Sequence, residues 1–224
     1  LVIDAGAVLR INTTSSMTSG ATIGGGGRMI ISPGAGNSGI FSYVGTSPPS
    51  GSPMLTGTSP TFRLGNGATT GSGSITGDLN ISSSNGVVIF NRPDDYTYGG
   101  AISFTAPSGG TAQIRKLLDN VLTLAGANTY TAPTSVAAGT LVVTGALGAT
   151  PITVANNANF TLQGTHGNAT GTINSNSTFR SIGGTSSIPG PKTGSRRPTV
   201  GAASATRTLG EVSLGPGPMR MRRG

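Results

Sequence analysis

Side chains able to act as acids, bases or nucleophiles are scarce in this 224-residue chain, which has six acidic residues, one histidine and no cysteine. The only adjacent carboxylates belong to Asp94 and Asp95. Neighbouring residues on a strand point to opposite faces, so these two groups would not converge on one glycosidic bond. Asp4, Asp78 and Asp119 would join them only if folding stacked them. We expect residues 92–95 to form a solvated turn, which disfavours a polysaccharide-cleaving enzyme.

The single histidine, His166, lies in a glycine-flanked segment and is expected to be an exposed turn residue. Without a second His or any Cys, a transition-metal site lacks ligands, and every Ser would have to share this one base. A glycine run at 24–27 precedes an apolar strand, but no helix and no Lys-Ser/Thr pair follow that could hold a phosphate. The sequence therefore predicts no metal, no cofactor and no enzymatic activity.

Short apolar strands recur at a constant step in the second half of the chain. Pairs of apolar residues two positions apart return at Leu122 and Leu124, at Leu141 and Val143, and at Phe160 and Leu162, with Phe179 alone at the next return. A spacing of two places both residues on one face of a strand, and a return about every 20 residues is typical of a solenoid. We predict an all-β, single-chain parallel β-helix in which the three pairs are buried.

The same alternation can be followed back towards the N-terminus, where its steps are less regular. The earlier pairs are Phe41 and Tyr43, Phe62 and Leu64, Leu79 and Ile81, and Ile102 and Phe104. Together the returns predict roughly nine rungs, about 5 Å apart. Residues 46–60 interrupt the alternation with four prolines. Since proline cannot donate to a strand ladder, we expect a protruding loop there, a candidate binding contact.

The segment 122–148, LTLAGANTYTAPTSVAAGTLVVTGALG, resembles the autotransporter-associated β-strand repeat, whose pattern is approximately LTLxGxNTYTGxTxVxxGTLxVxGxLG. The match departs at Ala132 and Pro133, where the family usually has two glycines. Upstream, Tyr98–Ile102 resembles the lead-in to that repeat. We place the repeat motif itself at residues 117–148. The resemblance implies an exported bacterial scaffold, at the cell surface or outside the cell. It implies no activity, because a shared fold does not supply one.

Composition supports one elongated domain and a separate tail. With 38 glycines, 9% charged residues and 4% aromatic residues, the chain cannot build a large globular core, whereas each rung of a solenoid buries only a few apolar side chains. We assign residues 1–189 to the solenoid and residues 190–224 to an irregular Gly/Pro/Arg-rich C-terminal tail. The tail carries seven of the fourteen Lys and Arg residues. A membrane-spanning helix needs about 20 apolar residues, and no apolar run approaches that length.

Both ends of the chain hold candidate assembly contacts: Leu1, Val2, Ile3, Val200, Leu209, Val212 and Leu214. No aromatic residue follows Phe179, so the basic tail lacks the stacking platform of single-strand binders, and we expect no nucleic-acid partner. An anionic envelope or polysaccharide surface, or a neighbouring subunit, suits an exported protein better. Because solenoid ends expose unpaired strand edges, we expect a non-enzymatic protein that self-associates into a surface fibre. The alternative is an adhesin-like passenger fragment of an autotransporter.

Overall fold

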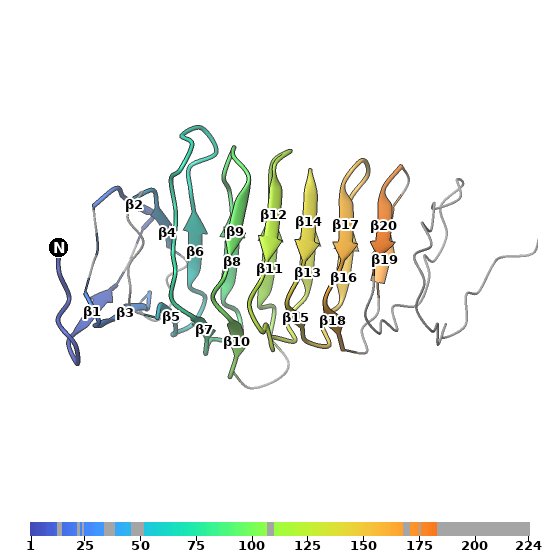
Figure 1. Ribbon diagram of the computed structural model, residues 1–224. Coiled ribbons are helices and arrows are strands. Elements are labelled where there is room, and N and C mark those ends of the chain that lie inside the picture. Colours follow the sequence, from blue (N-terminus) through green and yellow to red (C-terminus); the bar gives the residue numbers. More distant parts are fainter. Residues whose placement is uncertain are drawn as a thin grey trace, which may run out of the picture.

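In the computed structural model the chain is a β-solenoid, with strands stacked side by side along one axis from the N-terminus (Figure 1). The structure describes residues 1–12, 15–21, 23, 25–33, 39–45, 52–106, 110–167, 171–174 and 176–182. Every strand pair within these ranges is parallel. The predicted fold class is confirmed, and no helix able to span a membrane occurs among these residues.

One sheet runs the whole length of the solenoid and sets its turns. This eight-stranded sheet contains, in spatial order, β2 (Met17–Ser19), β4 (Ile40–Tyr43), β6 (Thr61–Leu64), β8 (Val87–Phe90), β11 (Gln113–Lys116), β13 (Thr134–Val136), β16 (Ile152–Val154) and β19 (Gly171–Ile173). Its strands correspond to eight turns, one fewer than the sequence suggested.

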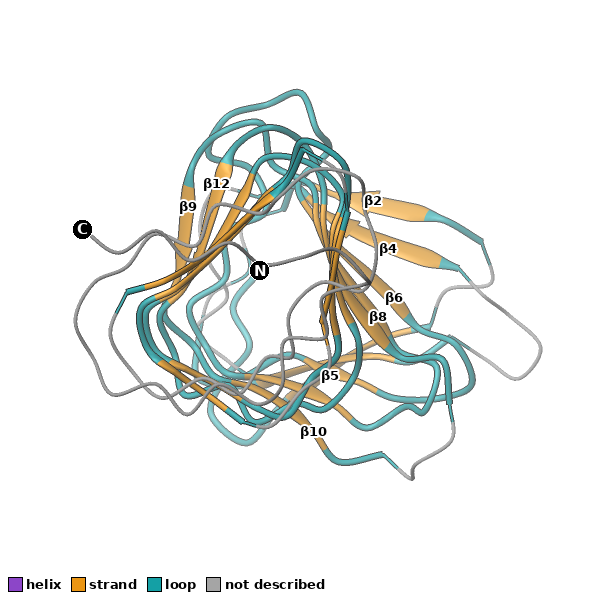
Figure 2. Cartoon of the chain, turned by 90° about the vertical axis from the view of Figure 1, so that its right-hand side faces the viewer, coloured by secondary structure: helices purple, strands orange, loops and turns teal. Residues whose placement is uncertain are grey.

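Three shorter sheets close the other two sides, which gives the three-sided cross-section seen along the axis (Figure 2). The N-terminal five-stranded sheet contains β1 (Val8–Ile11), β3 (Arg28–Ile31), β5 (Met54–Leu55), β7 (Leu79–Ile81) and β10 (Ile102–Phe104). The C-terminal five-stranded sheet contains β9 (Tyr96–Tyr98), β12 (Val121–Leu124), β14 (Thr140–Val143), β17 (Asn159–Leu162) and β20 (Thr178–Ser181). The two-stranded sheet contains β15 (Ala146–Leu147) and β18 (Thr165–His166).

The constant step seen in the sequence is the register of the C-terminal five-stranded sheet. Leu122 pairs with Leu141, Leu141 with Phe160, and Phe160 with Phe179, whose ring stacks on that of Phe160 at 5.5 Å. The six predicted core residues are all at most 1% exposed. Their burial confirms the assigned inside and outside, and it follows from the alternation of side chains along each strand.

The earlier part of the predicted ladder joined strands that lie on different sides. Phe41 does pair with Phe62, and their rings stack at 5.9 Å. However, Phe62 is followed in its column by Val88 rather than by Leu79, which lies in the N-terminal five-stranded sheet. Apolar residues at every second position identify the inner face of a strand, but they do not show on which of the three sides of the solenoid the strand lies.

The expectation of a proline-interrupted loop at 46–60 is wrong for its second half. Residues 46–51 lie outside the described residues, but β5 follows, with Leu55 fully buried. Pro53 and Pro60 each precede a strand, where their carbonyls accept hydrogen bonds from Asn80 and Val87 of the next turn. Proline lacks only the donor, so it is tolerated at the first position of a strand.

Candidate functional site

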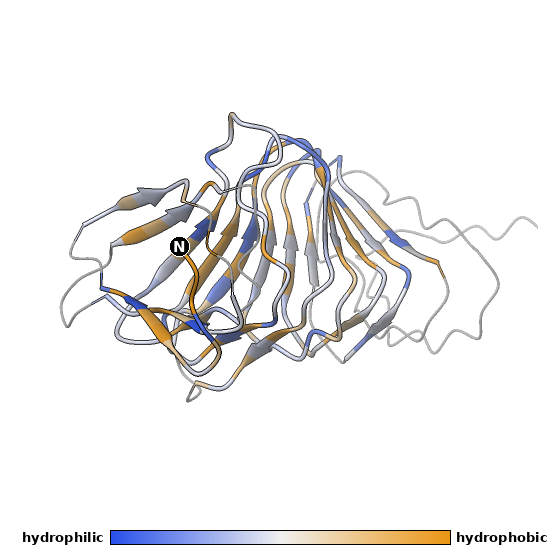
Figure 3. Ribbon diagram, turned by 60° about the vertical axis from the view of Figure 1, so that its left-hand side comes forward, coloured by the Kyte–Doolittle hydropathy of each residue, from blue (hydrophilic) through white to orange (hydrophobic). Residues whose placement is uncertain are grey.

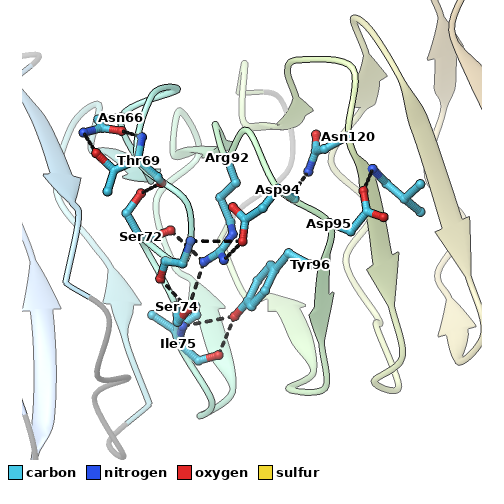
Figure 4. Close-up of polar contacts among 12 residues, drawn as sticks. Asn66, Thr69, Ser72, Ser74, Ile75, Arg92, Asp94, Asp95, Tyr96 and Asn120 are labelled. Atoms are coloured by element: carbon cyan, nitrogen blue, oxygen red, sulfur yellow. Dashed lines mark hydrogen bonds and ion pairs between the residues drawn. The ribbon is translucent and has the colours of Figure 1, made fainter.

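The richest polar cluster is a corner between β8 and β9, which we call the Arg92 corner (Figure 4). The Arg92 side chain is 4% exposed, and its Nη1 donates to the Ser72 carbonyl at 2.6 Å and to Ser74 Oγ at 2.8 Å. Its Nη2 forms an ion pair with Asp94 Oδ2 at 2.7 Å, and its guanidinium lies 4.2 Å from the centre of the Tyr96 ring. Arg92 therefore ties its own turn to the preceding one.

The two adjacent aspartates both bind backbone amides rather than facing a common point. Asp94 Oδ2 accepts from the Gly71 amide at 3.0 Å, and Asp95 Oδ1 accepts from the Val121 amide of the next turn at 2.7 Å. Burial by itself would raise the Asp94 pKa, but the Arg92 and Gly71 donors outweigh it and hold that pKa below its usual range. A carboxylate held ionised in this way is a poor general acid.

Tyr96 closes the exposed edge of the C-terminal five-stranded sheet, where β9 is the first strand. The Tyr96 hydroxyl accepts from the Ile75 amide at 3.0 Å and donates to the Ile75 carbonyl at 2.7 Å. Next to it, the Tyr98 hydroxyl donates to the Gly77 carbonyl at 2.7 Å. Side chains thus replace strand pairing at this edge, and they leave the sheet with a protected start.

A buried lysine extends the corner into the following turn. Lys116 is 1% exposed and lies in an interior column between Phe90 and Val136. Its Nζ donates to the Leu118 carbonyl at 2.7 Å and to Asn120 Oδ1 at 2.8 Å. Burial lowers the Lys116 pKa to about 8. Sequence reasoning missed this buried cation, because Lys116 occupies an inward position that an apolar residue would normally fill.

The expected solvated turn at 92–95 is wrong for Arg92, which is buried, whereas Asp95 is exposed and the carboxylates of Asp94 and Asp95 accept from backbone amides. Within the described residues no group of three or more His, Cys, Asp or Glu side chains could hold a metal ion. Asp78 binds the Ala101 amide, and no hydrogen bond joins a Ser or Thr hydroxyl to His166 among the contacts of the described residues. The corner joins successive turns through side chains and offers no nucleophile with a base.

His166 is also corrected, because it is buried at 7% exposure in β18 rather than exposed in a turn. It pairs with Leu147, and its Nδ1 lies against the Gly167 carbonyl. Burial lowers the His166 pKa, so the neutral form is favoured in the folded state. The sequence predicted a turn because Gly164 and Gly167 flank the two residues of this short strand.

The predicted repeat motif places one buried asparagine where it joins three turns. Asn128 Oδ1 accepts from the Ile102 amide of the preceding turn at 3.0 Å, and its Nδ2 donates to the Ala146 carbonyl of the following turn at 3.0 Å. Beside it, Gly126 lies against the Gly100 carbonyl so closely that a Cβ could not fit. The same approach recurs at Gly145 and Gly164, one and two turns later. These residues fix the spacing and rotation of one turn on the next.

The N-terminal end of the solenoid carries exposed apolar side chains beside the buried Ile3, Ile11 and Ile23, and we call it the N-terminal face. β1 and β2 are the end strands of their sheets. In β2, Met17 pairs with the fully buried Phe41 and so points inward, yet it is 43% exposed, since no strand of the described residues lies beyond β2 in its sheet. Figure 3 turns this end forward, with hydrophobic colouring on the chain at the N-terminus. The exposed large hydrophobic residues of the described chain all lie here: Leu1, Val2, Val8 and Met17.

The predicted assembly contacts divide into two groups. Leu1 and Val2 are 66% and 70% exposed, but Ile3 is buried at 7%, and its carbonyl accepts from the Gly27 amide of the second turn. The tail contacts, Val200, Leu209, Val212 and Leu214, and the whole segment 190–224 lie outside the described residues. The sequence did not identify Met17 as a candidate assembly contact, although an apolar residue that points inward on an end strand is a signal for one.

A comparison with protein families matches residues 119–143 to the passenger-associated-transport-repeat. The matched segment runs from just before β12 to the end of β14 and contains Gly126 and Asn128. It therefore covers the contacts that set one turn on the next, and the predicted resemblance to an autotransporter passenger repeat is confirmed there. No curated protein and no solved structure matches the chain.

Proposed function

We propose that this chain is a non-enzymatic structural part of an autotransporter passenger, presented at the cell surface, whose solenoids join end to end into a fibre. The N-terminal face carries the proposal, because among the described residues an apolar column ends there at the partly exposed Met17, and β1 and β2 are the end strands of their sheets. An open edge over an apolar core is a template for another parallel strand. The passenger-type repeat at 119–143 and the parallel solenoid support export and a scaffold role.

A test places charges on the N-terminal face. We expect Val8→Lys and Met17→Lys together to abolish fibres, because they remove two apolar contacts and add two charges to an edge. The matched control is Thr153→Lys, at an exposed position of β16, which has a paired strand on each side in the eight-stranded sheet. Negative-stain microscopy and sedimentation velocity measure assembly, and circular dichroism checks that each variant remains folded.

The result separates the two passenger functions. Fibres in the unmodified protein and the Thr153→Lys control, together with monomers in the N-terminal variant, support the proposal. A monomeric unmodified protein at all concentrations refutes assembly and favours the adhesin-like alternative. Fibres that persist in the folded double variant refute the N-terminal face as the contact.

A further inference from the structure

We infer that β2 of one molecule pairs in parallel with β19 of a second copy, so that the eight-stranded sheet continues from molecule to molecule. The inference rests on the proposed fibre and names the partner of its open edge. Among the described residues, β2 and β19 are the two end strands of this sheet, and each contains three residues. Because every pair between them is parallel, β19 offers an edge of the direction that β2 requires.

The side chains of the two strands complement one another in the register that the sheet already uses. β19 continues the column in which Ile152 pairs with Gly171 and Val154 with Ile173. At the other end, Met17 and Ser19 continue the column of Phe41 and Tyr43. Continuing both columns sets Met17 against Gly171 and Ser19 against Ile173. A large residue thus meets a glycine and a small residue meets a large one, which lets the two cores interlock without overlap.

A second side of the solenoid can continue in the same contact. β1 and β18 are the first and the last strand along the same side of the described molecule (Figure 1). Stacking one molecule on the next would therefore set the edge of β18 beside that of β1. Val8, which is 54% exposed on β1, would then lie at the junction.

The size of the contact is close to that of a stable interface. One regular turn runs from Val121 to Gly139, because Thr140 is the partner of Val121 in the next turn. Stable protein–protein interfaces use about 20–30 residues on each side, and one turn of 19 residues lies just below that range. The two surfaces differ, which makes the contact heterologous, and a heterologous contact extends as an open fibre unless its rotation closes a ring.

The absence of cysteine from the chain allows a clean test by disulfide trapping. Thr18 and Thr172 are exposed, outward-facing residues at the middle of β2 and β19, and the inferred register sets them side by side. Neighbouring strands lie about 4.8 Å apart, which is within the range that a disulfide spans. Full-length Thr18→Cys protein is mixed with a longer, tagged Thr172→Cys protein under fibre-forming conditions and then oxidised. The matched control is tagged Thr153→Cys, one turn further inside the same outward column.

We expect gain of a reducible heterodimer for Thr18→Cys with Thr172→Cys and none for Thr18→Cys with Thr153→Cys. The doubly substituted Thr18→Cys/Thr172→Cys protein should yield a ladder of covalent oligomers. Fibres without the heterodimer would refute the β2–β19 pairing while leaving end-to-end assembly intact. Equal cross-linking of both pairs, or disulfides only between two Thr18→Cys molecules, would also overturn the pairing. Absence of fibres from the unmodified protein would instead refute the proposed function on which this pairing rests.

Discussion

Asn128 offers the sharpest test of how one turn is held on the next. Replacing it by alanine leaves the Ile102 amide without the acceptor that Oδ1 supplies at 3.0 Å. Nδ2 also donates to the Gly126 and Ala146 carbonyls at 2.9 and 3.0 Å, but the Asn128 backbone amide donates to both as well. An unpaired buried donor costs about 1–3 kcal/mol, and the two lost carbonyl bonds add less because a donor remains. We expect Asn128→Ala to lower the free energy of unfolding by about 2–4 kcal/mol.

Asn128→Asp separates hydrogen bonding from shape, because aspartate is nearly isosteric with asparagine. One carboxylate oxygen keeps the Ile102 amide, but the other would face the Gly126 and Ala146 carbonyl oxygens without a donor, so the folded state raises the pKa of the new group above the unfolded value of about 3.9. A folded state that binds the proton more tightly loses stability as pH rises above the unfolded pKa. The Asp variant should therefore lose stability relative to the Ala variant between pH 4 and pH 7.

Urea unfolding followed by far-ultraviolet circular dichroism measures both variants. The control is Thr129→Ala, at the neighbouring exposed position, whose backbone bond to Ile102 the substitution leaves in place. The reasoning is refuted if Asn128→Ala unfolds at the same urea concentration as Thr129→Ala. It also fails if Asn128→Asp loses no stability, relative to Asn128→Ala, between pH 4 and 7.

Three further expectations concern the core, the buried lysine and the tail. Leu141→Asp should cost several kcal/mol because it places a charge in a column where Leu141 is 1% exposed, whereas Thr129→Asp should be nearly silent; equal melting temperatures would contradict the assigned faces. Folding lowers the Lys116 pKa from 10.5 to about 8, so between these pH values the unfolded chain binds more protons than the folded one. The free energy of unfolding should therefore rise with pH through this window. The urea midpoint measured from pH 7 to 9.5 should rise less for Lys116→Met than for the unmodified protein. Deleting residues 190–224 should reduce fibre mass without changing the β-rich circular dichroism, and undiminished assembly would show that the tail is no connector.

The parts of the fold that could be predicted from the sequence are those in which every turn has the same length. From Leu122 onward, one constant step determined the pairing of β12, β14, β17 and β20. Before β12 the step is longer, as between Val87 and its partner Gln113, because the chain takes 12 positions from Ile102 to Ile114 and only six from Asn128 to Thr134, their counterparts in the next turn. There, alternation alone could not assign Leu79 to the correct sheet.

Polar residues with inward positions were harder to predict than apolar ones. Lys116 and His166 are buried in strands, although side chains of these types are usually exposed to solvent. The burial of Lys116 is explained by the Leu117 and Leu118 carbonyls and the Asn120 Oδ1 that accept hydrogen bonds from its Nζ. The Arg92–Asp94 pair is local in sequence, yet its partners Ser72 and Ser74 come from the preceding turn. Such a corner depends on which turns become neighbours, and the irregular steps before β12 do not reveal that.

The parallel ladder also determines how the molecule responds to tension. The hydrogen bonds between strands run along the long axis, so a pull on the two ends of the chain breaks the bonds of one turn before those of the next. Each regular turn that detaches, such as the one from Val121 to Gly139, releases about 65 Å of extended chain. Peeling from the C-terminal side would advance in equal steps until it met the Arg92 corner, where the ion pair and the Tyr96 and Asn120 side chains must break together with the strand bonds. These side-chain contacts would therefore resist peeling that arrives from the C-terminal side.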